Sequence, residues 1–365
     1  MTDCIIVGGG VIGMLTAREL RQRGFAVRLL ERRECGGEAS WAGGGILAPL
    51  YPWRQPRAVN DLARESHLRC AWLFEQLHAQ TGIDPQHERS GLLVLDPPPR
   101  SEAEGWAQRH GFRCEHIGAA QVGELAPQLA IGPRLAAWLP ELGQVRPPRL
   151  MRALRRAVAL DGVEVREGEA VNGLLVERGR VAGVRSARGE IRAPLVVLAG
   201  GAWSGLPIAN LPLPPRVRPI RGQIILVRAQ PGLLKQIVLY RDRYLIPRRD
   251  GRILIGSTLE ETGFAKQTTE AARRQLWQHA TECLPALGHY GIEHQWAGLR
   301  PGSEDGVPYI CEHPQLPGLF LNTGHHRNGI VTGLASAQLC AQLISADKPL
   351  LDPAAYAFER RAASL

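Results

Sequence analysis

The sequence lacks the features that mark secreted or membrane-spanning proteins. Its seven cysteines are an odd number and contain no C-x-x-C pair, which argues against a disulfide framework and against a thiolate metal site. We therefore expect a reducing compartment and no bound metal. No charged amino-terminal segment leads into a long apolar one, and no run of about 18 apolar residues occurs, so we expect neither a secretory signal nor a membrane span. These absences favour a cytoplasmic location.

Lysine is also scarce. Only Lys235, Lys266 and Lys348 occur among 44 basic residues, so the net charge of +9 comes almost entirely from arginine. A positive field attracts polyanions, but these arginines are scattered and form no long basic run. The pattern favours an ordinary solvated surface, and we expect no nucleic-acid partner. At 365 residues the chain is long enough for two interleaved domains.

Glycine is abundant, and its most informative positions lie near the amino terminus. The apolar run 4–7 is typical of a buried parallel strand, and Gly8, Gly10 and Gly13 follow it at the spacing of the dinucleotide fingerprint. Gly8 permits a tight turn, Gly10 lets the backbone approach a pyrophosphate, and Gly13 lets the next helix lie close to the strand. The alternative is a glycine-rich turn without a ligand.

The residues after this turn favour the dinucleotide. A helix is predicted over 11–23, with Gly24 as its left-handed stop, and its amino-terminal N–H groups would point at the phosphates. A second strand over 26–30 ends at Glu31, where a carboxylate that binds the ribose belongs. The order of strand, turn, helix, strand and acid therefore predicts a bound dinucleotide.

A second glycine-rich stretch, residues 36–46, favours FAD over NAD. A long flavin dinucleotide needs a second surface where the backbone comes close, and Ser40 could reach a phosphate there. The alternative is a flexible loop.

The remaining stretches alternate between helical and strand patterns. Helices are predicted over 61–80, 101–110, 147–160, 271–284 and from about 329 to 344, and Ser101 with Glu104 predicts a capping box on the second of these. Strands are predicted over 92–95, 163–170, 173–176, 181–184, 195–198, 224–227, 237–240, 244–247, 253–255 and 319–323.

Further motifs carry a resemblance to a known family. They are the turn 221–223, the stretch 244–248 followed by 256–258, and the longer set 296–301, 305–309 and 324–329. Together with the amino-terminal fingerprint, they make the sequence resemble the D-amino-acid oxidase superfamily of FAD-dependent amine oxidoreductases. Within that superfamily it is most similar to the glycine oxidases of thiamin biosynthesis.

The resemblance implies an α/β protein with two domains. A Rossmann-like FAD-binding domain would be discontinuous and comprise residues 1–85, 141–215 and 297–365. An α+β substrate-binding domain, built on an antiparallel sheet, would comprise residues 86–140 and 216–296.

The resemblance also assigns three catalytic residues. Arg300 would bind the substrate carboxylate, because a guanidinium offers a planar pair of donors and stays charged. The hydroxyl of Tyr244 would give that carboxylate a second donor, and Arg327 would be a second active-site arginine near the flavin. The alternatives are structural ion pairs for the arginines and a buried strand residue for the tyrosine.

The resemblance places FAD against residues from several of these motifs. His325 and His326 could instead be read as metal ligands, but no matching Asp, Glu or Cys accompanies them, so we expect no metal. The expected cofactor-binding residues are Gly8, Gly10, Val11, Ile12, Gly13, Glu31, Arg32, Ala39, Ser40, Gly44, Gly45, Ile46, Val171, His325, His326, Arg327, Asn328, Gly329, Ile330 and Val331.

The implied reaction is oxidative deamination of glycine and small primary or secondary amines, such as sarcosine and D-alanine, with dioxygen as acceptor. FAD should be non-covalent, because no cysteine stands near Gly298, where covalent relatives carry one. Asp242 and Leu259 replace a histidine and a methionine of the glycine oxidase pocket, which leaves the preferred amine open. A quinone-linked D-amino-acid dehydrogenase, a non-catalytic binding protein and an RNA-modifying oxidase remain as alternatives, and a homo-oligomer remains open.

Overall fold

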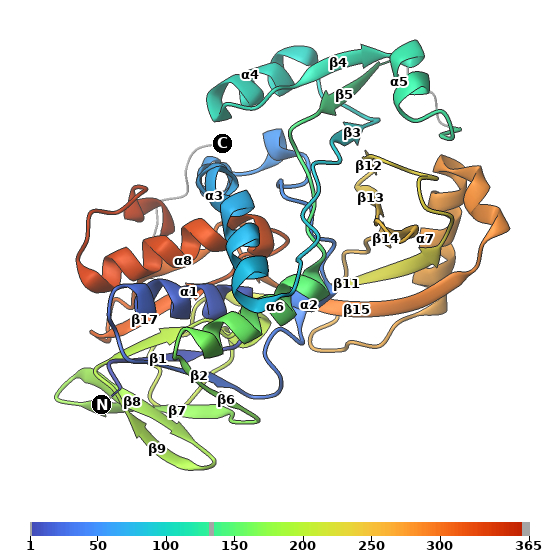
Figure 1. The fold of residues 1–365 in the computed structure, drawn as a ribbon. Coiled ribbons are helices and arrows are strands. Elements are labelled where there is room, and N and C mark those ends of the chain that lie inside the picture. Colours follow the sequence, from blue (N-terminus) through green and yellow to red (C-terminus); the bar gives the residue numbers. More distant parts are fainter. Residues whose placement is uncertain (1, 131–134, 360–365) are drawn as a thin grey trace.

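Two sheets dominate the architecture, one on each side of the molecule (Figure 1). The computed structural model describes residues 2–130 and 135–359, so the parts of the predicted domains at residues 1, 131–134 and 360–365 lie outside the described residues. The two sheets match the expected α/β class with a second, sheet-based region.

The first sheet has six strands and confirms the Rossmann-like prediction. Its order is β16 (Tyr309–Glu312), β17 (Leu319–Thr323), β10 (Leu195–Leu198), β1 (Cys4–Val7), β2 (Val27–Glu31) and β6 (Glu164–Glu167). All neighbours are parallel except β16, which runs antiparallel to β17. The central position of β1 explains its uniformly apolar sequence, since a parallel strand is buried on both faces.

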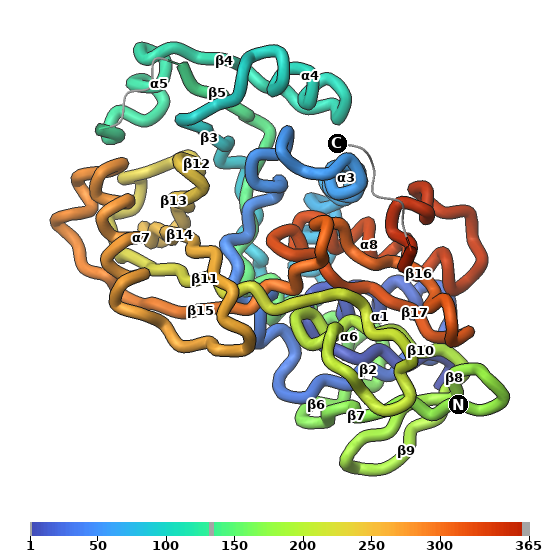
Figure 2. Tube along the Cα trace, turned by 180° about the vertical axis from the view of Figure 1, so that it is seen from behind, coloured from blue at the N-terminus to red at the C-terminus, as the bar shows by residue number. Residues whose placement is uncertain are grey.

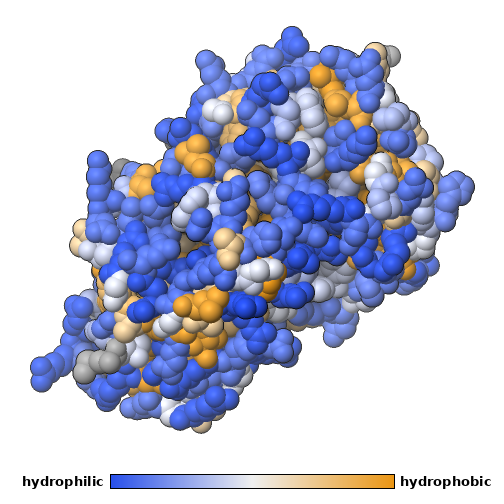
Figure 3. All heavy atoms as spheres, viewed as in Figure 1, coloured by the Kyte–Doolittle hydropathy of each residue, from blue (hydrophilic) through white to orange (hydrophobic). Residues whose placement is uncertain are grey.

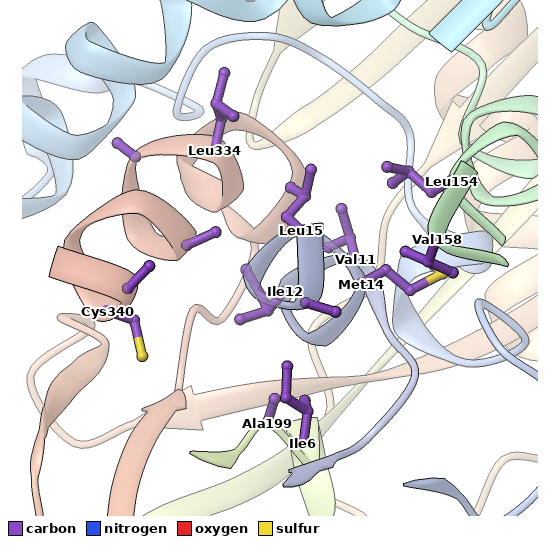
Figure 4. Close-up of a cluster of buried hydrophobic side chains, with 14 of the residues drawn as sticks. Ile6, Val11, Ile12, Met14, Leu15, Leu154, Val158, Ala199, Leu334 and Cys340 are labelled. Atoms are coloured by element: carbon purple, nitrogen blue, oxygen red, sulfur yellow. The ribbon is translucent and has the colours of Figure 1, made fainter. Parts of the chain in front are cut away.

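Three helices cover one face of this sheet: α1 (Val11–Gln22), α6 (Pro147–Leu160) and α8 (Gly329–Ser345). The helix α3 (Arg57–Thr81) packs on α8 and α6. Figure 4 shows α1 between α8 and α6, with Ile12 on the side of α8, Met14 on the side of α6, and Ile6 of β1 beneath them. A small three-stranded sheet consists of β7 (Val171–Glu177), β8 (Arg180–Ser186) and β9 (Gly189–Arg192). It packs on strands of the six-stranded sheet through a second apolar cluster.

The second sheet has eight strands. Its order is β15 (Ile292–Ser303), β11 (Val217–Arg228), β14 (Arg252–Gly256), β13 (Arg243–Pro247), β12 (Ile237–Tyr240), β3 (Leu92–Val94), β5 (Leu135–Leu139) and β4 (Glu115–Gly118). The long strands β11 and β15 pair along their length and run from this sheet toward the first one (Figure 2). Three helices belong to this region: α4 (Arg100–His110), α5 (Ala119–Leu125) and α7 (Glu270–Cys283). Of these, α5 and α7 contact strands of the sheet.

Several details of this half differ from the prediction. The sheet is mixed, because β12 and β3 are parallel. The capping box is wrong, because α4 begins at Arg100 with Pro99 as its N-cap and without a side-chain capping bond, which leaves Ser101 inside the first turn. The strand patterns of β4, β5 and β15 were not recognised. Proline and glycine within β15 are typical of loops, so its sequence does not indicate a strand.

The short elements are the helix α2 (Ala39–Ala42) and the 3₁₀ turns η1 (Pro52–Arg54), η2 (Gly201–Trp203), η3 (Pro285–His289) and η4 (Pro353–Tyr356). One face of the molecule is mostly hydrophilic, with hydrophobic side chains in small separate patches (Figure 3). Across the described residues, no helix has the length and apolar character needed to cross a bilayer.

Candidate functional site

A cavity of about 530 Å³ lies where the two sheets meet, and residues from both contribute to its walls. Every residue predicted for the site except Gly13 lines this cavity. The sequence motifs, which are far apart along the chain, therefore converge on one space. Their individual roles toward a ligand stay predictions.

The glycines after β1 shape one wall by the absence of side chains. Gly8 has φ +115°, and a Cβ there would lie 2.4 Å from the carbonyl oxygen of Ala199. A Cβ on Gly13 would lie 1.9 Å from the carbonyl oxygen of Gly8, so Gly13 acts by letting α1 approach β1 and has no place on the cavity wall. This bare backbone beside the cavity fits a pyrophosphate.

Two polar side chains complete this wall. Ser40 lines the cavity, and its Oγ accepts a hydrogen bond of 2.9 Å from the first N–H group of α1, on Val11. Glu31 is 8% exposed at the end of β2, and its two carboxylate oxygens accept hydrogen bonds from the N–H groups of Gly9 and Arg33. The position of Glu31 on the cavity wall fits a carboxylate that binds a ribose hydroxyl.

An aromatic and charged group also lines the cavity. The guanidinium carbon of Arg32 lies 3.6 Å from the ring centroid of Trp203, and Arg32 forms an ion pair with Glu38 at 3.0 Å. Both partners line the cavity, as does Val171. Trp203 and Glu38 were not predicted as cavity residues, although Trp203 lies five residues after the predicted strand 195–198.

Arg300 and Tyr244 project into the cavity from the second sheet. Nη2 of Arg300 donates to Oγ of Ser257 at 2.7 Å, and Nη1 donates to the carbonyl oxygen of Thr258 at 3.2 Å. Glycines make room for both side chains. A Cβ on Gly222 would lie 2.0 Å from Nη2 of Arg300, and one on Gly256, the cross-strand neighbour of Tyr244, would lie 2.7 Å from the tyrosine hydroxyl.

The charge of this wall is positive and uncompensated. Among the described residues, neither Arg300 nor Arg327 has an ion-pair partner within 4.0 Å. Burial, followed by the charge of Arg327, lowers the pKa of Arg300 to about 10, while Tyr244 and Glu260 act in the opposite direction. Arg300 therefore remains protonated at neutral pH. Two cations that face one cavity, with no carboxylate within 4.0 Å of either among the described residues, favour an anionic ligand.

The two histidines are neutral in this environment. Burial lowers the pKa of His325 to about 3, and Nε2 of His325 lies 3.0 Å from Oγ of Ser336. Burial, then the charges of Arg300 and Arg327, lowers the pKa of His326 to about 4. Across the described residues, no group of three His, Cys, Asp or Glu side chains could hold a metal ion.

The helix α8 begins beside these histidines. Asn328 is its N-cap residue and offers no side-chain capping bond, and the first residues of the helix line the cavity. Its amino-terminal N–H groups and positive dipole end are suited to the N1 and C2=O edge of a flavin, which is negative in the reduced form.

Arg248 does not line the cavity but supports one of its walls, a role that the sequence did not predict. It is 8% exposed, and its guanidinium donates to the carbonyl oxygens of Gly44 at 2.7 Å and of Val145 at 3.1 Å. It therefore fixes the second glycine-rich stretch to the end of β13. By contrast, Asp242 and Leu259 do not line the cavity, and Leu259 is 61% exposed; their influence on the preferred amine stays a prediction.

Comparison with known proteins agrees with this geometry. The profile of the family described as FAD dependent oxidoreductase matches residues 3–343. A glycine oxidase of Pseudomonas aeruginosa is 46% identical over 354 residues, which cover 97% of each chain. The bifunctional protein ThiO/ThiG of Synechocystis is 33% identical over 98% of this chain and 53% of its own length. The crystal structure of glycine oxidase from Geobacillus kaustophilus is 30% identical, covers 99% of both chains and superposes with a TM-score of 0.90.

The bare-backbone wall, the carboxylate at the end of β2 and the paired arginines all suit a flavin dinucleotide beside a small anionic substrate. None of the cysteines lines the cavity within the described residues, which fits a cofactor held without a covalent bond. With a profile match that extends over most of its length, the chain belongs to the family of FAD-dependent oxidoreductases.

Proposed function

We propose that the protein is an FAD-dependent glycine oxidase. It deaminates glycine and small primary or secondary amines such as sarcosine and D-alanine, and forms glyoxylate or the corresponding oxo acid, ammonia or amine, and hydrogen peroxide. The observation that carries this proposal is the pair of arginines, Arg300 and Arg327, which face the cavity and have no ion-pair partner within 4.0 Å in the part of the chain that the structure describes.

Arg300 and Tyr244 form the clamp for the substrate carboxylate, because Arg300 has N–H donors that its protein contacts leave free. Arg300 carries five N–H donors, and two of its hydrogen bonds go to Ser257 and Thr258, which leaves donors for a substrate carboxylate. The hydroxyl of the buried Tyr244 lies beside the same guanidinium. Holding the carboxylate between them fixes the position of the α-carbon, and such positioning can contribute several kcal/mol toward the reaction barrier.

The surroundings of Tyr244 favour substrates without a charged side chain. Ala48, Leu50, Ile224 and Tyr244 belong to one apolar cluster and line the cavity. An α-carbon with no side chain or a methyl group fits such a wall, whereas a charged side chain would lose its hydration there. FAD, when bound, accepts the hydride from the α-carbon and passes electrons on to dioxygen.

The cellular setting belongs to the same proposal. All seven cysteines lie in the described part of the chain and are free, which suits the reducing cytoplasm. We propose a cytoplasmic enzyme whose partners are its amino-acid substrate and dioxygen, with a role in thiamin biosynthesis.

Anaerobic reduction of the bound flavin tests this function. Glycine, sarcosine and D-alanine should bleach the flavin absorbance, whereas methylamine, which lacks the carboxylate, should not. Under air, each turnover should release one hydrogen peroxide. Rapid dye reduction with little peroxide would instead identify a dehydrogenase, and no bleaching by any carboxylated amine would refute the proposal.

A further inference from the structure

The orientation of Arg300 depends on residues 257–260, which follow strand β14. Its two terminal nitrogens donate to the side chain of Ser257 and to the main chain of Thr258. A flexible guanidinium can adopt many orientations, so its direction in the cavity is set by where these two acceptors lie. Whatever fixes residues 257–260 therefore also fixes the clamp.

The carboxylate of Glu260 is the centre of the contacts that fix this segment. Its Oε1 accepts hydrogen bonds from the hydroxyl of Thr258 at 2.5 Å and from Nε2 of Gln223 at 2.9 Å. Its Oε2 accepts a hydrogen bond from Nη2 of Arg221. The main chains of Arg221 and Glu260 also exchange two hydrogen bonds, at 2.9 and 3.0 Å, which join the segment to β11.

The same contacts keep Glu260 from neutralising the clamp. Arg221 is 7% exposed and pairs with Glu260, whereas Arg300 has no ion-pair partner among the described residues. Burial raises the pKa of Glu260, but the hydrogen bonds from Thr258, Arg221 and Gln223 outweigh it, so the pKa lies below its usual value. Glu260 is therefore ionised at neutral pH, and its charge is directed toward Arg221.

We propose that Glu260 is a positioning residue for the substrate carboxylate. It orders residues 257–260 and thereby aims Arg300, while Arg221 holds the carboxylate of Glu260 away from direct pairing with the clamp. This inference rests on the proposed function, because it takes the ligand of Arg300 to be the carboxylate of a small amino acid.

The test compares Glu260→Ala with Glu261→Ala. Glu261 is the next residue and forms an exposed ion pair with Arg218 at 2.9 Å, which makes its variant a matched control. A misplacement of about 1 Å in a positioned group can cost about a hundredfold in rate. We expect Glu260→Ala to raise the KM for glycine, and the Kd for glycolate measured from flavin absorbance, by about tenfold or more, with a smaller change in kcat. Glu260→Gln keeps part of the hydrogen bonding, so its glycolate Kd should lie between those of the unmodified enzyme and of Glu260→Ala.

A second background separates positioning from general damage. In an Arg300→Ala protein the group that Glu260 aims is gone, so adding Glu260→Ala should change the glycolate Kd by less than about twofold. The same loss in both backgrounds would overturn the inference, as would an unchanged Kd for Glu260→Ala in the otherwise intact enzyme. If the unmodified holoenzyme neither binds glycolate nor is bleached by glycine, the proposed function fails instead.

Discussion

The two halves of the cavity are built in different ways. Along the six-stranded sheet, the part of the wall from Gly8 to the start of α1 is main chain, and its shape depends on missing side chains, with side chains such as Glu31 beside it. Along the eight-stranded sheet, the wall is made of side chains from separate strands, such as Tyr244 of β13 and Arg300 of β15. Following the proposed function, we call the first wall the cofactor half and the second wall the substrate half. The cofactor half should be sensitive to an added Cβ, whereas the substrate half should be sensitive to the loss of particular functional groups.

The halves meet at the ends of β15 and β17. The main-chain N–H of His326 donates to the carbonyl oxygen of Pro301 at 2.7 Å, and an isolated bridge joins Gly302 to His325. Arg300 is thus one residue from a direct link to the segment that leads into α8. This link explains how Arg327, from the first half, faces the same cavity as Arg300.

The largest effect on the affinity for FAD should come from adding a methyl group in the cofactor half. Gly8→Ala places a Cβ 2.4 Å from a main-chain oxygen, so the loop must move, and we expect the affinity for FAD to fall by about a hundredfold or more. Fluorescence titration of the apoprotein with FAD measures this loss. Gly24→Ala is the matched control, because Gly24 also has a positive φ but no atom within 4 Å of its Cβ position. Equal affinities for the two variants would contradict the comparison.

Removing a functional group from the substrate half should leave the cofactor in place. Arg300→Ala deletes the clamp, and we expect kcat/KM for glycine to fall by about a thousandfold, as for the loss of strong charge-assisted hydrogen bonds. The yellow flavin spectrum should remain. The control is Arg218→Ala on the adjacent strand, whose side chain is 64% exposed. Loss of flavin together with activity would mean that Arg300 is structural and that the two halves do not divide the work.

The same difference explains what the sequence could predict. The wall around Gly8, Gly10 and Gly13 is formed by neighbours in sequence, so the order of strand, glycine turn, helix, strand and acid predicted a dinucleotide. The clamp joins residues from β11, β13, β15 and the segment after β14, and only the family resemblance pointed to Arg300 and Tyr244. The role of Arg248 could not be predicted, because its contacts with Gly44 and Val145 depend on how distant segments pack. The strand β15 was not predicted, because Gly298, Pro301 and Gly302 interrupt its strand-like sequence pattern.

The smallest effect should come from a side chain that lies beside the main-chain part of the cofactor half. The Oγ of Ser40 accepts the first N–H of α1, so Ser40→Ala leaves that donor without its partner, at a cost of about 1 kcal/mol by analogy with lost helix caps. We expect FAD to bind about fivefold more weakly, as measured by the titration used for Gly8→Ala. Ser101→Ala is the control, because Ser101 is exposed in α4 and caps nothing. A loss as large as that of Gly8→Ala would show that the phosphate wall depends on this side chain as much as on the glycine backbone, and the contrast between the two halves would then fail.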